Sequence, residues 1–256
     1  MKHSITDIKK LLDKKVEEYN QILFIKNDPI SIPHQYTLKQ DIEISAFFAA
    51  MFAWGNRTTI INKTKELMQY MDNAPYQFIL QHSEQDLKKM NSFVHRTFNS
   101  NDLFYFIHFF KKHYQEFDSL ENAFIGENIF SMKERLIHFH QYFFFEEHLI
   151  RTKKHVSTPL KNSACKRLNM FLRWMVRKDK MGVDFGIWHH IKMNELICPL
   201  DVHVCNVSFR LGLLQNKKSN WLNAEKLTDT LKTFDPNDPI KYDFALFALG
   251  AEERFK

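Results

Sequence analysis

Hydrophobic side chains recur at helical spacing along most of this 256-residue chain, rather than alternating as they do in β-strands. Residues 5–25 carry apolar side chains along one face, which predicts an amphipathic helix. Residues 39–54 are almost entirely apolar after Ile42, and no charged residue follows Glu43 in this run. The run therefore predicts a buried central helix that is too short to span a bilayer.

Other segments extend the same pattern. Helices are also expected at 59–72, 76–90 and 101–117, twice within 119–150, from Lys166 to about Val176, and at 221–231. The chain contains only six glycines and seven prolines, which is low for an all-β protein. The sequence therefore predicts an all-α protein, built as one large domain or as two lobes.

The segment that begins at Cys198 has a distinct order of residue types. Pro199 disfavours a helical conformation at Cys198, and Asp201 follows where a new helix should begin. The Asp201 carboxylate can accept a hydrogen bond from an unpaired N–H group of the first turn. Gly212 is a natural end for this helix.

The helix that begins at Lys166 has two different faces. With a rotation of about 100° per residue, its large apolar side chains gather on one side. Lys166, Arg173 and Arg177 lie on the opposite side, which predicts a polar stripe. A surface lysine and a reactive lysine in a cleft would give the same pattern. Lys166 and Asp201, each near a helix N-terminus, are candidates to face one another across a cleft.

The positive charge is concentrated in one segment. The formal net charge is +6, but residues 151–180 contain ten Lys or Arg and one acid, Asp179. That segment carries +9 and the rest of the chain carries −3. Such a patch indicates a polyanionic partner, although a solvated helix face is the commoner origin of a charge run.

Cysteine content and hydropathy indicate an intracellular protein. The three cysteines, Cys165, Cys198 and Cys205, do not suggest a disulfide framework, and three thiolates are too few for an iron–sulfur cluster. No apolar run approaches membrane length, and the N-terminus lacks the apolar region of a signal peptide. We expect a soluble cytoplasmic protein without a metal, a cofactor or membrane contact.

Several motifs resemble those of known DNA repair enzymes. Pro-Leu-Asp-Val-His-Val at 199–204, followed by Arg-Leu-Gly-Leu at 210–213, resembles the aspartate signature of the helix-hairpin-helix DNA glycosylases. In that superfamily a hairpin precedes the helix that carries a lysine nucleophile, and residues 162–166 match this segment. The whole chain resembles an uncharacterised bacterial family, domain of unknown function 2400, related to that superfamily. This closer resemblance rests on residues 53–57, 165–175 and 241–247. Archaeal 8-oxoguanine DNA glycosylases look like its nearest enzymes of known activity.

The resemblance implies a fold and an activity. It implies two helical lobes with a cleft between them, one of about 40–178 and the other of about 1–39 plus 179–256. It implies base excision repair of damaged double-stranded DNA, at the bacterial nucleoid while the enzyme acts. A DNA glycosylase of this type removes a damaged base, such as an oxidised purine, and can also cleave the strand as an abasic-site lyase. Lys166 would be the nucleophile, and Asp201 would stabilise the cationic sugar.

The resemblance and the basic patch together also indicate DNA-binding residues. The residues expected to read a flipped base are Trp54, Asn56 and Trp188. Those expected to contact DNA or to provide a cationic field are Arg57, Lys161, Arg167, Arg173 and Arg177. The turn that contains Trp54 can equally be a helix C-terminus with a solvated arginine, followed by a helix that Thr58 or Thr59 caps.

Two departures from the superfamily pattern leave alternatives open. Asn162 and Ala164 replace two hairpin glycines, and alanine adopts positive φ poorly, so the hairpin is expected to be altered or lost. Positions 166 and 201 differ by 35, a longer separation than in common members. The rival interpretation is a catalytically silent DNA- or RNA-binding module in which Asp201 is a plain N-cap. The protein is thus a predicted, but not a certain, enzyme.

Overall fold

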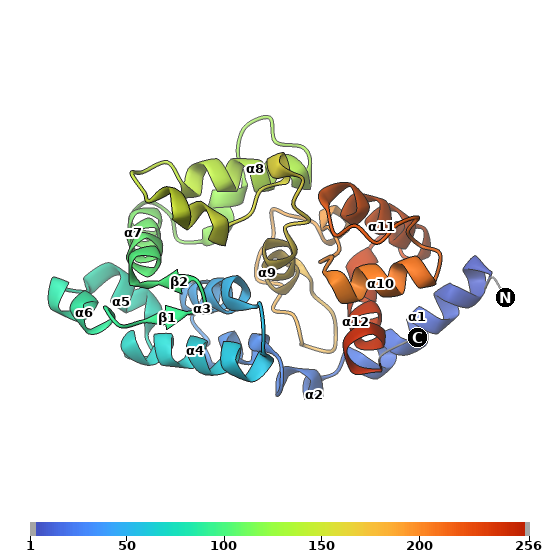
Figure 1. The fold of residues 1–256 in the computed structure, drawn as a ribbon, viewed down its shortest axis with the longest axis horizontal. Coiled ribbons are helices and arrows are strands. Elements are labelled where there is room, and N and C mark those ends of the chain that lie inside the picture. The colour runs from blue at the N-terminus through green and yellow to red at the C-terminus, as the bar shows by residue number, and fades with distance from the viewer. Residues whose placement is uncertain (1–3, 254–256) are drawn as a thin grey trace. The chain divides into compact units, whose positions relative to one another are not determined.

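A computed structural model describes residues 4–253 of the protein, and it is mostly helical (Figure 1). The α-helices are α1 (Ile5–Tyr19), α2 (Ile22–Ile25), α3 (Lys39–Phe52), α4 (Arg57–Tyr70), α5 (Pro75–Gln81), α6 (Glu84–Lys89), α7 (Ser100–Glu116), α8 (Met132–Phe143), α9 (Lys166–Val176), α10 (Val202–Arg210), α11 (Trp221–Phe234) and α12 (Tyr242–Phe247). Within the described residues the sheet structure is a single antiparallel hairpin of β1 (Val94–His95) and β2 (Phe98–Asn99). The all-α prediction is confirmed. None of the described helices is long and apolar enough to cross a membrane.

The chain forms two compact units. Unit one consists of Met1–Ile25 and Thr158–Lys256, and unit two is Lys26–Ser157. These boundaries differ from the expected lobes, because α9 belongs with the C-terminal segments and not with the residues before it. Backbone hydrogen bonds explain the difference, since Phe185 N–H donates to the Trp174 carbonyl and Trp188 N–H to that of Met175.

Helix α3 is the centre of unit two. All eleven residues from Ile42 to Phe52 are buried, so the prediction of a buried central helix is confirmed. Phe47 lies among four other phenylalanine rings of α7 and α8, with ring centroids 5.4–5.9 Å away: Phe106, Phe110, Phe139 and Phe143. Aromatic rings at such distances each bury a large apolar area, so this cluster is the main apolar core of the unit.

Glu43 is the charged residue inside this core. Its carboxylate is fully buried and accepts hydrogen bonds from Tyr114 Oη (2.8 Å), Ser119 Oγ (2.7 Å) and Leu120 N (2.9 Å). A buried carboxylate without donors would be strongly destabilising, so these contacts fasten α3 to α7 and to the following turn. Burial and the neighbouring Glu43 raise the pKa of Tyr114 well above its ordinary value.

Unit two contains a second buried carboxylate at the start of α7. Asp102 closes a capping box with Asn99 and also accepts hydrogen bonds from Arg151, Thr152 (2.8 Å) and His155 (3.2 Å). Burial raises the pKa of Asp102, but hydrogen bonds from His155, Asn99 and Thr152 outweigh this effect and lower the pKa to about 2. Asp102 therefore ties the segment Ile150–His155 to the hairpin and to α7.

In unit one, α12 is surrounded by other helices. Residues Tyr242 to Leu246 are buried, with α1 and α10 both packed against this helix. Tyr242 Oη donates a hydrogen bond of 2.8 Å to Asp13 of α1. This arrangement brings residues near both ends of the chain into one core.

Asp102 provides a test of the packing of unit two. Asp102→Asn should lower the free energy of unfolding at pH 7 by about 3 kcal/mol, because buried donors lose a charged acceptor. The folded pKa of about 2 lies below the ordinary 3.8, so the contribution of Asp102 exists above pH 3.8 and is lost as the pH falls through 2. Urea unfolding of the wild type and of Asp102→Asn should therefore show that the difference between their free energies of unfolding becomes smaller below pH 4. The exposed Asp229→Asn is the control, and an equal loss there would contradict the assignment.

Candidate lysine–aspartate site

Lys166 is the first residue of α9 and follows a strained turn. The turn contains the 3-10 helix Pro159–Lys161 and two residues in the left-handed region, Asn162 (φ 54°) and Cys165 (φ 49°). Asn162 thus adopts the conformation that a glycine would favour, whereas Cys165, and not Ala164, takes the second such position. A three-residue 3-10 helix and two left-handed residues thus precede Lys166, and the resemblance of this turn to an altered superfamily hairpin stays a prediction.

The two candidate catalytic side chains are half-buried. Lys166 Nζ lies 3.3 Å from Met170 Sδ, one turn further along α9. Asp201 is the N-cap of α10, and its Oδ1 accepts a 2.9 Å hydrogen bond from Val204 N–H. The predicted capping role of Asp201 is confirmed.

Asp243 of α12 connects these two side chains electrostatically. Burial raises the pKa of Asp243 to about 6, the positive charges of Arg173 and Lys166 oppose this shift, and the negative charge of Asp201 adds to it. Burial also raises the pKa of the Cys198 thiol well above its ordinary value, and Asp243 and Asp201 contribute in the same direction. Arg173 of α9 donates a hydrogen bond to Asp243, and α10 packs against α12, so α9, α10 and α12 are neighbours within unit one.

Arg173 and Arg177 lie in a buried ion-pair network and do not form an exposed stripe. They are only 4% and 1% exposed. Arg173 pairs with Asp184 (3.2 Å) and Asp243. Arg177 pairs with Asp184, Asp179 and Asp238 at 2.7–3.0 Å. The predicted polar stripe is covered, because the chain after α9 places acidic residues against this face of the helix, and this burial gives no support to the assignment of both arginines to DNA binding.

Trp188 and Arg167, which were also predicted to contact DNA, are both partly or fully buried. Trp188 is 2% exposed and lies edge-on to Phe171, with ring centroids 5.4 Å apart. It is a core residue of unit one, and this position gives no support to its assignment as a base-reading residue. Arg167 is half-buried, and burial lowers its pKa to about 10.

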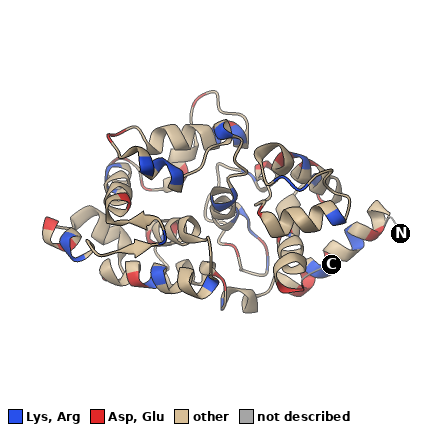
Figure 2. Ribbon diagram, in the orientation of Figure 1, with Lys and Arg blue, Asp and Glu red and all other residues tan. Residues whose placement is uncertain are grey.

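Three lysines are exposed beside the Lys166 turn, and two of them, Lys217 and Lys218, were not predicted from the sequence. Ser163 forms a β-bridge with Asn220, and Trp221 N–H donates to the Asn162 carbonyl, so the turn lies beside the loop 215–220. Lys161 is exposed on one side of this contact, and Lys217 and Lys218 are exposed on the other. Residues 202–224 contain no Asp or Glu, which is the signal that could have revealed this surface. Figure 2 shows where the Lys and Arg positions lie on the ribbon.

The other predicted base-reading residues belong to unit two. Asn56 is the N-cap of α4 and accepts a 3.1 Å hydrogen bond from Thr59 N–H, so the expected cap at Thr58 or Thr59 is wrong. Arg57 is the first residue of α4, and Trp54 is half-buried under the guanidinium of Arg96. The sequence placed these residues at a turn correctly but did not indicate that Arg96 lies over Trp54.

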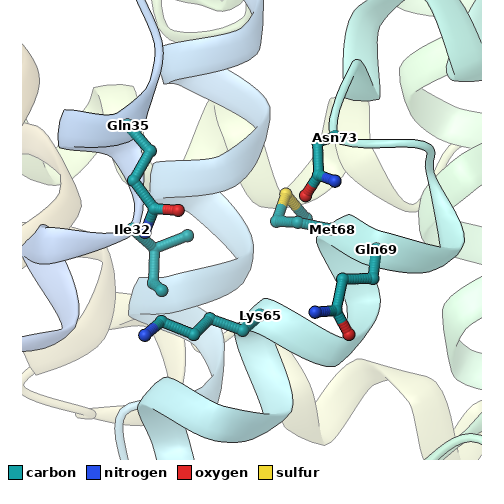
Figure 3. A pocket seen from close by; sticks show the side chains of 6 residues that line it. All are labelled: Ile32, Gln35, Lys65, Met68, Gln69 and Asn73. Carbon is teal, nitrogen blue, oxygen red and sulfur yellow. The ribbon is translucent and has the colours of Figure 1, made fainter.

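A cavity of about 190 Å³ lies elsewhere in unit two (Figure 3). Its lining consists of amide side chains, one ammonium group and an apolar floor: Gln35, Gln69, Asn73, Lys65, Ile32 and Met68. Gln35 Nε2 already donates to the Ser31 carbonyl at 3.1 Å. Among the described residues, no group of three or more His, Cys, Asp or Glu could hold a metal ion.

The fold and the site define a helical protein in which a lysine begins one helix, an aspartate caps a second, and a third carries a buried carboxyl group. Over residues 28–252 the chain matches the family described as "Protein of unknown function (DUF2400)", and it belongs to this family. No curated protein and no solved structure matches the chain. The expected membership of this uncharacterised family is confirmed, and the resemblance to helix-hairpin-helix DNA glycosylases remains a prediction.

The pKa of Asp243 gives a test of the site's electrostatics. Protonation of Asp243 stabilises the folded protein below the ordinary pKa of 3.8, and this stabilisation is lost as the pH rises through about 6. Asp243→Asn has no such titration. The free energy of unfolding of the wild type, minus that of the variant, should therefore fall by up to about 3 kcal/mol between pH 4 and pH 7. Urea unfolding at several pH values measures the difference, and a difference independent of pH would contradict the assignment.

Proposed function

We propose that the protein is a DNA glycosylase with abasic-site lyase activity that uses Lys166 as its nucleophile and Asp201 as the partner carboxylate. The observation that carries this proposal is that the segments before Lys166 and before Asp201 are hydrogen-bonded to the same loop. Trp221 N–H donates to the Asn162 carbonyl, and Ser219 Oγ donates to the Leu200 carbonyl at 2.9 Å. The lysine and the aspartate are 35 positions apart in the sequence, yet the starts of α9 and α10 are both held to this loop. This is the juxtaposition that the resemblance to the glycosylase superfamily implies.

The chemistry needs a neutral amine and a stabilised sugar cation. As the C1′–N bond breaks, its electron pair leaves with the base, and Lys166 Nζ forms a new bond to C1′. Opening of the sugar ring then gives an iminium ion, from which loss of the C2′ proton expels the 3′ phosphate. Keeping an ordinary lysine neutral at pH 7 costs about 5 kcal/mol, so the site must supply cationic neighbours and burial. The Asp201 carboxylate would stabilise the positive charge that develops on the sugar.

The exposed lysines of unit one supply a surface for the DNA backbone. Lys161, Lys217 and Lys218 lie on two adjoining loops, directly beside the turn that leads to Lys166. Phosphate contacts by such lysines position a duplex without reading its sequence. This surface replaces Arg173 and Arg177 in the proposal.

A second candidate function is a DNA- or RNA-binding module without catalytic activity. The altered hairpin favours it, because a 3-10 helix and the left-handed Cys165 replace the usual geometry before the lysine. The capping hydrogen bond of Asp201 is also sufficient reason for an aspartate at that position.

Borohydride trapping distinguishes these two functions. With a duplex that carries an abasic site, wild-type protein should form a covalent adduct, because borohydride reduces the iminium ion. Lys166→Gln should reduce the adduct to background while leaving duplex binding within about twofold, since one charge of several is lost.

The nearby Lys161→Gln is the matched control, because Lys161 is exposed and lies five positions before Lys166. It should retain the adduct. If the adduct disappears in Lys161→Gln and survives in Lys166→Gln, then Lys161 is the nucleophile and the assignment of Lys166 is wrong. The absence of any wild-type adduct across several lesions would favour the non-catalytic module.

Asp201→Asn separates catalysis from capping. Asparagine keeps an oxygen that can cap α10 but removes the negative charge, so the melting temperature should change little. Base release should fall by two or more orders of magnitude, because the sugar cation loses its counter-charge. Base release and thermal melting are measured on the same preparations. Normal base release in this variant would exclude a catalytic role for the Asp201 charge.

A further inference from the structure

The tip of the β-hairpin in unit two places an arginine over a tryptophan. The guanidinium carbon of Arg96 lies 4.6 Å from the Trp54 ring centroid. Arg96 and Thr97 form the two-residue turn of the hairpin, because His95 pairs with Phe98. The Arg96 side chain is exposed, and Trp54 is half-buried.

Two unusual backbone positions make this stack possible. Arg96 has a φ of 57°, in the left-handed region that favours glycine or asparagine. Gly55 has a φ of 107°, and a Cβ atom there would lie 2.4 Å from Arg96 Nη1. Two segments distant in sequence thus both have the backbone needed to place one guanidinium group.

Neighbouring residues hold the Arg96–Trp54 stack in position. His95 Nε2 donates a 3.0 Å hydrogen bond to the Phe52 carbonyl, and its ring lies edge-on to Trp54, with ring centroids 6.1 Å apart. Arg151 Nη2 donates to the Thr97 carbonyl at 2.6 Å, which fixes the other half of the turn. Hydrogen bonds of His95 and Thr97 therefore fix the hairpin that carries Arg96.

Stability alone does not explain an arginine at this position. The backbone strain of a left-handed residue other than glycine is at least as large as the stabilisation that an exposed cation–π contact provides. Glycine or asparagine would form the same turn without the strain. Arginine at this position is therefore neutral or unfavourable for folding.

The electrostatic surroundings point to an anionic ligand. Residues 44–65 and 87–101, which include both sides of the stack, contain no Asp or Glu. Among the described residues, Arg96 forms no ion pair with a carboxylate. The stacked guanidinium still presents the N–H donors along its edge, which match two oxygens of a phosphate group.

We propose that Arg96, stacked on Trp54, is a binding site for a phosphodiester group of double-stranded DNA. This phosphate site rests on the proposed function only in the choice of DNA as the molecule that carries the phosphate. The guanidinium edge would hold two phosphate oxygens, and the indole would keep the guanidinium in a fixed orientation.

Binding of an undamaged duplex to Arg96→Asn tests the site, with fluorescence anisotropy as the readout. Asparagine accepts positive φ, so the melting temperature should stay equal or rise. Affinity at fixed salt should fall about tenfold, as for loss of one charge-assisted contact, and the slope of log K against log salt should decrease by about 1. Lys133→Gln, an exposed cation of α8, is the matched control and should change affinity less than about twofold.

Tryptophan fluorescence provides a local measurement. Trp174, Trp188 and Trp221 are at most 3% exposed, so Trp54 is the accessible indole of the described chain. Duplex DNA should change the emission of wild-type protein but not that of Arg96→Asn. Inorganic phosphate alone should cause little change, because a single phosphate group lacks the other contacts of a duplex.

Four results would overturn the proposal. The first is an affinity of Arg96→Asn that matches that of the Lys133→Gln control. The second is loss of binding only in proportion to a large fall in melting temperature. The third is a response to inorganic phosphate equal to the response to the duplex, and the fourth is Arg96-dependent binding of RNA but not of DNA. Because the duplex is undamaged, none of these results depends on the chemistry of Lys166, so the proposed function and this site can fail separately.

Discussion

The structure of unit one depends on the buried ion pairs around Arg173 and Arg177. Two guanidinium groups lie between four carboxylates, those of Asp179, Asp184, Asp238 and Asp243. The carboxylates raise the pKa of Arg177 above its ordinary value, although burial acts in the opposite direction. Removal of one partner from such a network leaves a buried charge and costs about 3–5 kcal/mol, so these residues fix α9 rather than add surface charge.

This network also determines what the site beside it can do. Arg173 belongs both to the network and to the surroundings of Asp243, which in turn responds to Lys166 and Asp201. Helix α9 therefore carries the lysine at its start and Arg173 further along, and Arg177 is the residue that follows its last turn. The position of Lys166 is thereby fixed by interactions within unit one, and the candidate site depends on the packing of α9 and not on the altered hairpin.

The sequence predicted the features that local periodicity and capping chemistry encode. The buried helix α3 followed from an uninterrupted apolar run, and the start of α10 followed from Pro199 and Asp201. The surroundings of Arg173, Arg177 and Trp188 did not, because a helical wheel shows which residues share a face but not which distant segment covers it. The carboxylates that pair with the two arginines come from residues 179–243, and Trp188 packs on Phe171 of α9, contacts between segments that no local pattern encodes.

Both proposed sites contain a residue with a left-handed backbone conformation. Six described residues other than glycine have positive φ, and four of them are Asp or Asn, which tolerate this conformation: Asp72, Asn73, Asn128 and Asn162. The two exceptions are Arg96 and Cys165. One carries the guanidinium stacked on Trp54, and the other immediately precedes Lys166. Backbone strain of this kind persists only where the surrounding structure enforces it, and it concentrates at functional sites. In this protein the two strained exceptions are Arg96, to which we assign phosphate binding, and Cys165, which directly precedes the lysine to which we assign catalysis.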